Sequence, residues 1–199
     1  MKKRIFTVLM AASMAFAMTA CGSDAGQTKD SAADTSADTT EAVEASEDAF
    51  TVGICQLMEH DALGAATQGF KDALVEALGE ENVIFDEQNA QGDSNTCSTI
   101  VNGFVAADVD LILANATPAL QSAAAGTNEI PILGTSVTEY GVALEIDDFN
   151  GTVGGNISGT SDLAPLDGQA DMIKEIFPDV QNIGLLYCSA EANSLYQVE

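Results

Sequence analysis

The sequence predicts an α/β protein in which a parallel β-sheet is flanked by helices. Three observations indicate this fold. Short apolar runs alternate with amphipathic helical patterns, the apolar runs end in polar residues, and the connections are short. Because right-handed crossovers bring the carboxyl ends of parallel strands to one edge, we expect the loops that follow the strands to share one rim.

The first predicted strand–helix pair begins the globular part of the chain at Phe50. Residues Phe50–Gln56 form the strand, and a helix capped by Asp61 runs to Leu78, where Gly79 stops it. Its apolar residues recur at three- and four-residue spacing, which predicts an inward stripe made of Leu63, Ala66, Phe70, Leu74 and Leu78.

The second pair has the same organisation. Residues Asn82–Asp86 form the strand, and Asn89–Asp93 form its turn. Asp93 or Ser94 caps a helix that ends near Ala107. Its inward residues are Ile100, Phe104 and Val105.

The third pair, Asp110–Pro118 and the helix after it, is the most informative stretch. Leu111–Ala114 is continuously apolar, as in a strand buried on both faces of a sheet. Thr117 is a good N-cap, and Pro118 suits the first position of a helix that ends near Gly126. Since helix N-termini attract anions, this turn is either a plain cap or one wall of a ligand site.

The pattern changes after the fourth strand, Ile130–Gly134, and its hydroxyl-rich loop Thr135–Thr138. Glycines are frequent in residues 140–160, which we interpret as an extended crossing or hinge. Later residues predict the helix Leu166–Phe177, the buried strand Asn182–Tyr187, and a helix that starts at Asn193 or Ser194. These elements are too few for a second core, so either they pack onto the first lobe or, as we favour, the sequence is a fragment.

The N-terminal residues have the pattern of a targeting segment. A basic start is followed by the apolar run Ile5–Ala17, which is too short to span a bilayer comfortably. Met18–Cys21 resembles a bacterial lipobox, and this resemblance implies cleavage before Cys21 and a lipid on its sulfur. We therefore predict a signal peptide (1–20), a disordered acidic tether (21–49), a first lobe (50–144), a crossing (145–160) and the start of a second lobe (161–199).

Composition excludes several function classes. The formal net charge is −25, from 31 acidic and 6 basic residues, which argues against nucleic-acid binding. His60 is the only histidine, so a multi-histidine metal site is excluded, and no phosphate-binding glycine loop is present. We expect no cofactor. Cys55, Cys97 and Cys188 lack metal-ligand spacing and are interpreted as buried small residues, which leaves a single Cys55–Cys97 bridge open.

Seven short motifs, taken in order, resemble one family. They are Thr51–Ile54, Glu59–His60, Asn89–Asp93, Ala116–Pro118, Ile130–Ile132, Gly154–Asp162 and Glu191–Ser194. The family is the solute-binding proteins of bacterial ABC importers, in the uncharacterised group related to binding proteins for tryptophan and other aromatic amino acids. The resemblance implies a periplasmic-binding-protein-like fold of type I, in which two α/β lobes joined by a hinge capture a ligand between them.

Polar residues at the predicted strand ends are the candidate ligand contacts. A carboxylate and an imidazole could meet an α-amino group or a ring, and hydroxyls with helix amides could bind a carboxylate. An acidic residue past the crossing could pair with an ammonium group. Turn formation and helix capping are the alternatives for most of them. The candidates are Glu59, His60, Asn115, Thr117, Thr135, Ser136, Thr138, Asp162, Asn193 and Ser194.

The resemblance implies an extracytoplasmic receptor that is anchored to the cell membrane through the lipid on Cys21. It would capture a small solute by hinge closure and deliver it to ABC permease subunits. The expected solutes are amino acids, the aromatic ones among them. One alternative is a ligand-sensing module for a membrane receptor. The other is an α/β enzyme, but the predicted rim offers only Glu59, His60 and Asp61 as an acid–base set, so we expect no catalysis.

Overall fold

The computed structural model describes residue 46 and residues 48–199. Five strands form one parallel sheet in the order β2-β1-β3-β4-β5. The strands are β1 (Phe50–Gln56), β2 (Val83–Asn89), β3 (Leu111–Asn115), β4 (Ile132–Val137) and β5 (Ile157–Ser161). The helices are α1 (Asp61–Leu78), the 3₁₀ turn η1 (Glu80–Asn82), α2 (Ser94–Ala107), α3 (Thr117–Gly126), α4 (Tyr140–Ala143), α5 (Leu166–Ile176) and α6 (Ala192–Val198). The predicted α/β class is confirmed.

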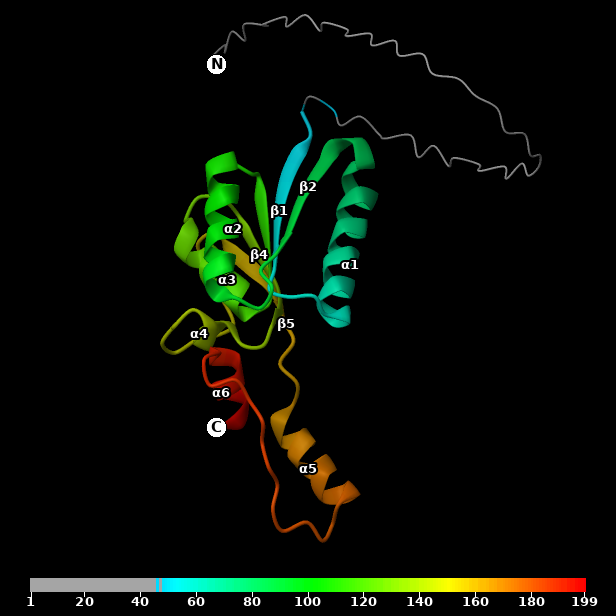
Figure 1. Cartoon of the computed structure of the whole chain (residues 1–199), viewed down its shortest axis with the longest axis vertical. Helices are drawn as coiled ribbons and strands as arrows, with labels where there is room; N and C mark the ends of the chain where they lie inside the picture. Colours follow the sequence, from blue (N-terminus) through cyan, green and yellow to red (C-terminus); the bar gives the residue numbers. More distant parts are fainter. Residues whose placement is uncertain (1–45, 47) are drawn as a thin grey trace, which may run out of the picture. The chain divides into compact units, whose positions relative to one another are not determined.

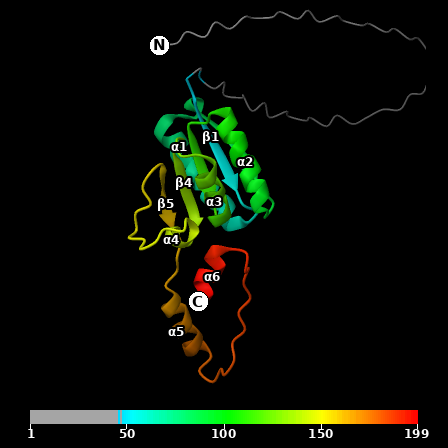
Figure 2. The ribbon, with the colours of Figure 1, turned by 90° about the vertical axis from the view of Figure 1, so that its left-hand side faces the viewer.

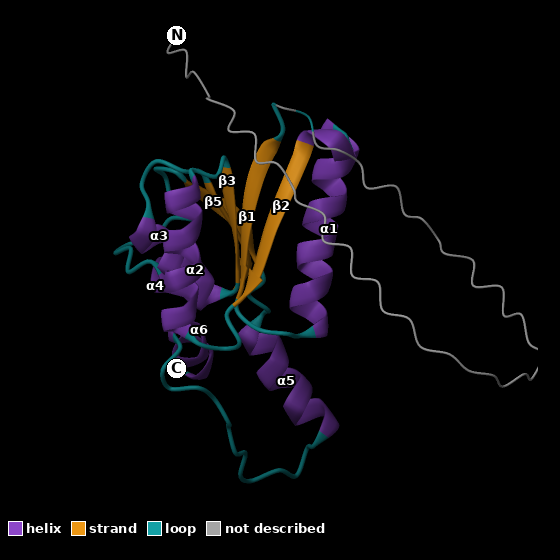
Figure 3. Ribbon diagram, turned by 45° about the horizontal axis from the view of Figure 1, so that its top comes forward, coloured by secondary structure: helices purple, strands orange, loops and turns teal. Residues whose placement is uncertain are grey.

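Helices cover both faces of the sheet, α1 on one side and α2 with α3 on the other (Figures 1 and 3). Strand alternation explains this arrangement, because successive side chains point to opposite faces. Val52, Ile54 and Leu113 pack with Phe70 and Leu74 of α1. The opposite faces of the same strands supply the larger cluster, together with residues of α2 and α3: Cys55, Cys97, Phe104, Ile112, Ala114 and Leu120.

The strand order places a switch point between β1 and β3. The chain leaves β1 toward β2 on one side and returns through α2 to β3 on the other side. In doubly wound sheets of the order 2-1-3-4-5, ligands bind at such a switch point, outside the carboxyl ends of the strands. β5 forms the far edge of the sheet, next to β4 (Figure 2).

Two predicted helix starts are wrong by one position. His60, not Asp61, is the N-cap of α1, since the Ala62 N–H donates to His60 Nδ1 at 3.2 Å. Ala116, not Thr117, is the N-cap of α3, and it makes no side-chain capping bond. On α1 the predicted stripe also ends early, because Leu78 is 41% exposed while Thr67 is buried.

Strand bounds differ from the prediction where backbone pairing extends beyond the apolar run. β2 continues to Asn89, in register with Gln56 of β1. β4 begins at Ile132 and includes Thr135 and Ser136, which were predicted to lie in a loop. The glycine-rich residues predicted as an extended crossing contain α4 and the start of β5, which pairs with β4.

The C-terminal stretch departs most from the prediction. The α5 helix ends one residue earlier than expected, and α6 begins at Ala192 after Glu191 as its N-cap. The predicted strand Asn182–Tyr187 is wrong, because these residues have no strand partner and are exposed.

In the described part of the chain, no helix combines the length and the hydropathy that a membrane span requires. The predicted signal peptide, Cys21 and most of the tether lie outside the described residues.

Candidate ligand-binding site

The register of the sheet aligns the polar ends of its strands. Gln56 of β1 lies opposite both Asn89 of β2 and Asn115 of β3, and Asn115 lies opposite Thr135 of β4. The loops that follow these strands therefore leave one edge of the sheet, as predicted. We call this edge the rim and define it as Leu57–His60, Ala90–Asp93, Ala116–Thr117, Ser136–Thr138 and Asp162.

Backbone hydrogen bonds hold neighbouring loops of the rim together. The Gly92 N–H donates to the Leu57 carbonyl at 2.8 Å, and the Leu57 N–H donates to the Asn115 carbonyl at 3.2 Å. The Ala116 N–H donates to the Thr135 carbonyl at 3.0 Å. These bonds continue the parallel ladders past the strands, so the rim is a connected backbone surface.

A buried polar network supports the rim from below. The Thr67 hydroxyl donates to Gln56 Oε1 at 2.8 Å, and Asn115 Nδ2 donates to Thr67 Oγ1 at 2.9 Å and to the Leu63 carbonyl at 2.8 Å. These bonds tie α1 to β1 and β3. Asn115, a predicted ligand contact, is fully buried, and its Oδ1 has no hydrogen-bond partner in the described part of the chain.

The loop after β1 presents exposed side chains of mixed chemistry. Glu59 and His60 are exposed, and Glu59 Oε2 accepts a hydrogen bond from Asn89 Nδ2 at 3.5 Å. Met58, which was not among the predicted contacts, is 42% exposed and lies against Gly92 of the next loop. An exposed methionine offers a polarisable surface that favours aromatic rings. The sequence signal for it was an apolar residue directly before Glu59.

The junction of β3 and α3 contains a strained backbone. Ala116 has φ 92° and ψ 159°, a conformation that side chains with a Cβ rarely adopt. Thr117 and Pro118 then occupy the first turn of α3, and both are buried. The strain fixes the direction in which α3 leaves the rim. Strained residues of this kind concentrate at functional sites.

The end of β4 and the loop from there to α4 are fastened to β5. Ser136 adopts a left-handed conformation with φ 54°, and Thr138 is buried. The Ser161 hydroxyl donates to the Thr138 carbonyl at 2.6 Å, and the Asp162 N–H donates to the Val137 carbonyl at 3.0 Å. Asp162 is exposed, so its carboxylate extends the rim.

Tyr140 of α4 is buried against the two strands beside this loop. Its hydroxyl donates to the Thr160 carbonyl at 3.2 Å. Glycines at Gly134 and Gly159 admit the tyrosine, because a Cβ at either position would meet its hydroxyl. Burial raises the pKa of Tyr140 to about 12, despite the opposing effect of the bond to Thr160, and the charge of Asp162 adds to the increase.

The structure brings eight of the ten predicted contacts to the strand ends, with unequal exposure. Glu59, His60 and Asp162 are exposed, whereas Asn115, Thr117 and Thr138 are buried. The remaining two, Asn193 and Ser194, lie on α6, a helix whose Gln197 Nε2 reaches Thr138 Oγ1 at 3.5 Å. A ligand role for all ten residues stays a prediction.

A cavity of about 420 Å³ lies elsewhere, beside β5. Its lining includes Tyr140, Phe149 and Gly151–Gly154, and none of the ten predicted contacts belongs to it. Among the described residues there is no group of three or more histidine, cysteine, aspartate or glutamate side chains that could hold a metal ion. The rim therefore offers hydrogen-bonding groups, carboxylates and one exposed apolar side chain, that of Met58.

Comparison with known proteins supports a binding role. The sequence family described as ABC transporter substrate binding protein matches residues 51–199. The tyrosine-binding protein of Clostridioides difficile (strain R20291) is 39% identical over 153 residues, which cover 74% of this chain and 43% of that protein. The chain thus spans less than half the length of this relative.

Two solved structures resemble the fold. The ABC domain from Streptococcus pneumoniae in complex with L-Trp has a TM-score of 0.70 at 34% identity. A ligand-free, open substrate-binding protein with adhesive properties from Clostridium difficile has a TM-score of 0.60 at 39% identity. Each similarity covers 75% of this chain and 51% of the other. The chain has a periplasmic-binding-protein-like fold and belongs to the ABC transporter substrate-binding protein family.

Proposed function

We propose that the protein is the solute-binding component of an ABC importer and that its solute is an aromatic amino acid. The observation that carries the proposal is the rim at the β1–β3 switch point, in a chain similar to a tyrosine-binding protein and to a structure with bound L-Trp. In this proposal residues 50–144 form the first lobe, residues 145–160 the crossing and residues 161–199 the start of the second lobe.

The exposed residues of the rim match the groups of an amino-acid zwitterion. Asp162 and Glu59 supply carboxylates for the ammonium group, and charge-assisted hydrogen bonds of this kind are the stronger ones. Met58 supplies an apolar surface for the aromatic ring. The buried residues Asn115, Thr117 and Thr138 hold the rim in shape, which keeps the contacts preorganised.

The cellular arrangement in this proposal follows the predicted N-terminus. A lipid on Cys21 anchors the protein outside the cytoplasm, and the acidic tether lets the lobes reach the permease subunits. Closure of the lobes around the solute produces the form that the permease recognises. The family match, which covers residues 51–199, supports the extracytoplasmic location and the permease partner of this proposal.

Isothermal titration calorimetry of the full chain with tyrosine, tryptophan and phenylalanine tests the proposal, with leucine as the aliphatic comparison. We expect saturable binding of at least one aromatic amino acid and weaker binding of leucine. Absence of binding to all three aromatic amino acids, or tighter binding of leucine, would contradict the ligand assignment.

Two substitutions, each at a residue proposed to touch the solute, test where the solute binds, and a third is a control. Asp162→Asn should weaken binding of the preferred amino acid roughly tenfold, because it removes the charge that faces the ammonium group. Asp179→Asn is the matched control, since Asp179 is also exposed but lies outside the rim. Met58→Ala should reduce the affinity for the aromatic amino acid more than that for leucine. Equal losses for Asp162→Asn and Asp179→Asn would remove Asp162 from the site.

A further inference from the structure

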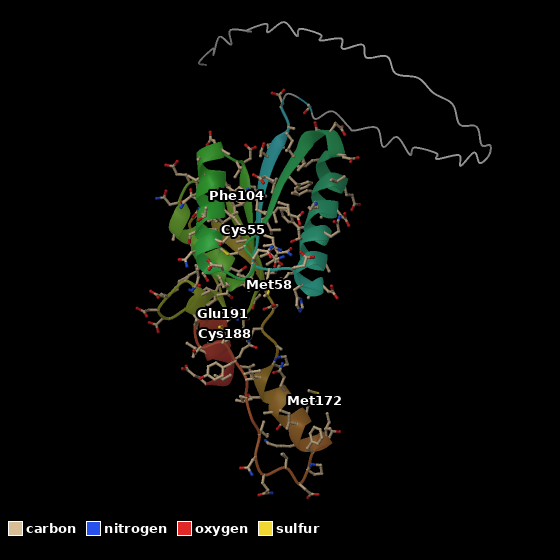
Figure 4. The ribbon with its side chains drawn as sticks, viewed as in Figure 1. Cys55, Met58, Phe104, Met172, Cys188 and Glu191 are labelled. Atoms are coloured by element: carbon tan, nitrogen blue, oxygen red, sulfur yellow. The ribbon has the colours of Figure 1, made fainter. Side chains whose placement is uncertain are left out.

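Two of the described cysteines are buried against each other. Cys55 lies on β1, and Cys97 lies in the first turn of α2, and neither has any exposed surface. Both belong to the core cluster between the sheet and α2, and their thiols share a hydrogen bond. Figure 4 shows Cys55 beside Phe104 in this layer. The third described cysteine, Cys188, is exposed.

The strands and helices around the pair bring it close to the rim. Cys55 directly precedes Gln56, the end of β1, and the Cys97 N–H donates to the carbonyl of Asp93, the N-cap of α2, at 3.1 Å. A covalent link between the two sulfurs would therefore join the loops after β1 and β2. It would close a loop that contains all of α1 and β2.

We propose that Cys55 and Cys97 form a disulfide that fastens β1 to α2 when the protein folds in an oxidising compartment. The proposal rests on the extracytoplasmic location given under the proposed function. Disulfides persist in such compartments, whereas cytosolic thiols are kept reduced. No metal-ligand role competes for the pair, because the described residues contain no metal-binding cluster.

The reaction is a thiol–disulfide exchange with a small disulfide or a disulfide oxidoreductase as the oxidant. The hydrogen bond from Cys55 lowers the pKa of Cys97, while that bond and burial raise the pKa of Cys55. Cys97 also lies in the first turn of α2, and a helix N-terminus favours a thiolate, so Cys97 supplies the first thiolate. It attacks one sulfur of the oxidant, forms a mixed disulfide and releases the first thiol of the oxidant.

Cys55 then completes the exchange. Its sulfur loses a proton and attacks the sulfur of Cys97, which releases the second thiol of the oxidant. The two protein thiols thus lose two electrons and two protons, and the oxidant is reduced to two thiols. Because both sulfurs are closed off in the folded core, the exchange occurs before the core closes or during an opening of α2.

The test is refolding of the full chain in oxidised or reduced glutathione, followed by an acid quench, unfolding, alkylation and peptide mapping. We expect a linked Cys55–Cys97 peptide only in the oxidised sample, and a melting temperature raised by about 5–10 °C. Cys97→Ala should abolish both the linked peptide and the shift. Cys188→Ser is the control and should retain both.

Full alkylation of Cys55 and Cys97 in wild-type protein refolded with oxidised glutathione would overturn the proposal, without reliance on any variant. Cells that express the full chain, treated with an alkylating agent before lysis, provide the second arm. A linked peptide from these cells supports the proposal. If the pair links in glutathione but is alkylated in the cells, the disulfide does not form in the compartment of the protein and the proposal is refuted. Calorimetry of amino-acid binding tests the proposed function independently of this outcome.

Discussion

Many large apolar side chains are buried in the sheet region, residues 50–161, but none is buried in the C-terminal region, residues 162–199. In the sheet region Ile54, Phe104 and Leu120 are fully buried. In the C-terminal region Ile176, Phe177 and Leu186 are each at least 59% exposed, and α5 and α6 contain no buried residue. An apolar side chain contributes to stability only where other elements cover it, so the two regions should respond differently to the same substitution.

The sharpest contrast is between two phenylalanines. Phe104→Ala should lower the free energy of unfolding by about 4 kcal/mol, because Phe104 fills the space that Gly53 leaves open above β1. Phe177→Ala should change it by less than about 0.5 kcal/mol, since Phe177 is 60% exposed. Urea unfolding followed by circular dichroism measures both, and comparable losses would contradict the distinction between the regions.

Two glycines give the next contrast. Gly134→Ala should destabilise the protein by about 2 kcal/mol, because the added methyl group meets the buried Tyr140. Gly184→Ala should be nearly neutral, as no atom lies within 4 Å of its added Cβ. Combining Gly134→Ala with Tyr140→Phe removes the nearest atom, so the double variant should lose less than the sum of the two single losses. If the losses in free energy of unfolding add exactly, the contact between the added methyl group and Tyr140 is not the cause of the destabilisation in Gly134→Ala.

Tyr140 also predicts a dependence on pH. Since the pKa of Tyr140 is raised to about 12 in the folded protein, from an unfolded value near 10, its neutral form stabilises the fold below pH 10, and this contribution is lost as the pH rises through 12. Tyr140→Phe should cost about 1 kcal/mol at pH 7, where the bond to Thr160 is lost. The difference from wild type should shrink above pH 10.

Urea unfolding at pH 7, 9, 10 and 11 measures this change. Tyr187→Phe is the control from the C-terminal region, because Tyr187 is 48% exposed, and it should shift stability little at any of these values. If the difference in free energy of unfolding between wild type and Tyr140→Phe stays constant from pH 7 to pH 11, the raised pKa of Tyr140 is refuted.

The contrast between the sheet region and the C-terminal region also explains which elements the sequence could predict. The bounds of β1, α1 and α2 were predicted closely, because each has a local signal: an apolar run, a spaced stripe or a capping aspartate. The strand expected at Asn182–Tyr187 did not form, although the helix α5 beside it did. A helix satisfies its backbone within one segment, whereas a strand needs a neighbouring strand that no local pattern reveals.

The candidate site follows the same rule. The shared rim was predictable, because parallel topology alone places the strand ends together. The network of Gln56, Thr67 and Asn115 was not predicted, since it joins residues 11 and 48 positions apart through the packing of α1 on the sheet. The capping role of Thr117 was wrong because β3 extends to Asn115 and Ala116 takes the cap position, at a backbone conformation that favours glycine.

The smallest effect expected is a gain in stability. Ala116→Gly should raise the free energy of unfolding by about 0.5–1 kcal/mol, because glycine adopts φ 92° without strain. Ala170→Gly, an exposed position within α5, should instead lower helix content slightly, as glycine disfavours helix interiors. Stability changes of opposite sign for the same substitution would sharpen the comparison, since only the sheet region contains packing strong enough to hold an alanine under strain.

A loss of stability in Ala116→Gly would show that the methyl group of Ala116 packs favourably enough to outweigh its strain. Calorimetry of this variant links stability to function: if the strain orients α3 for the solute, the variant binds the aromatic amino acid more weakly while unfolding at higher urea.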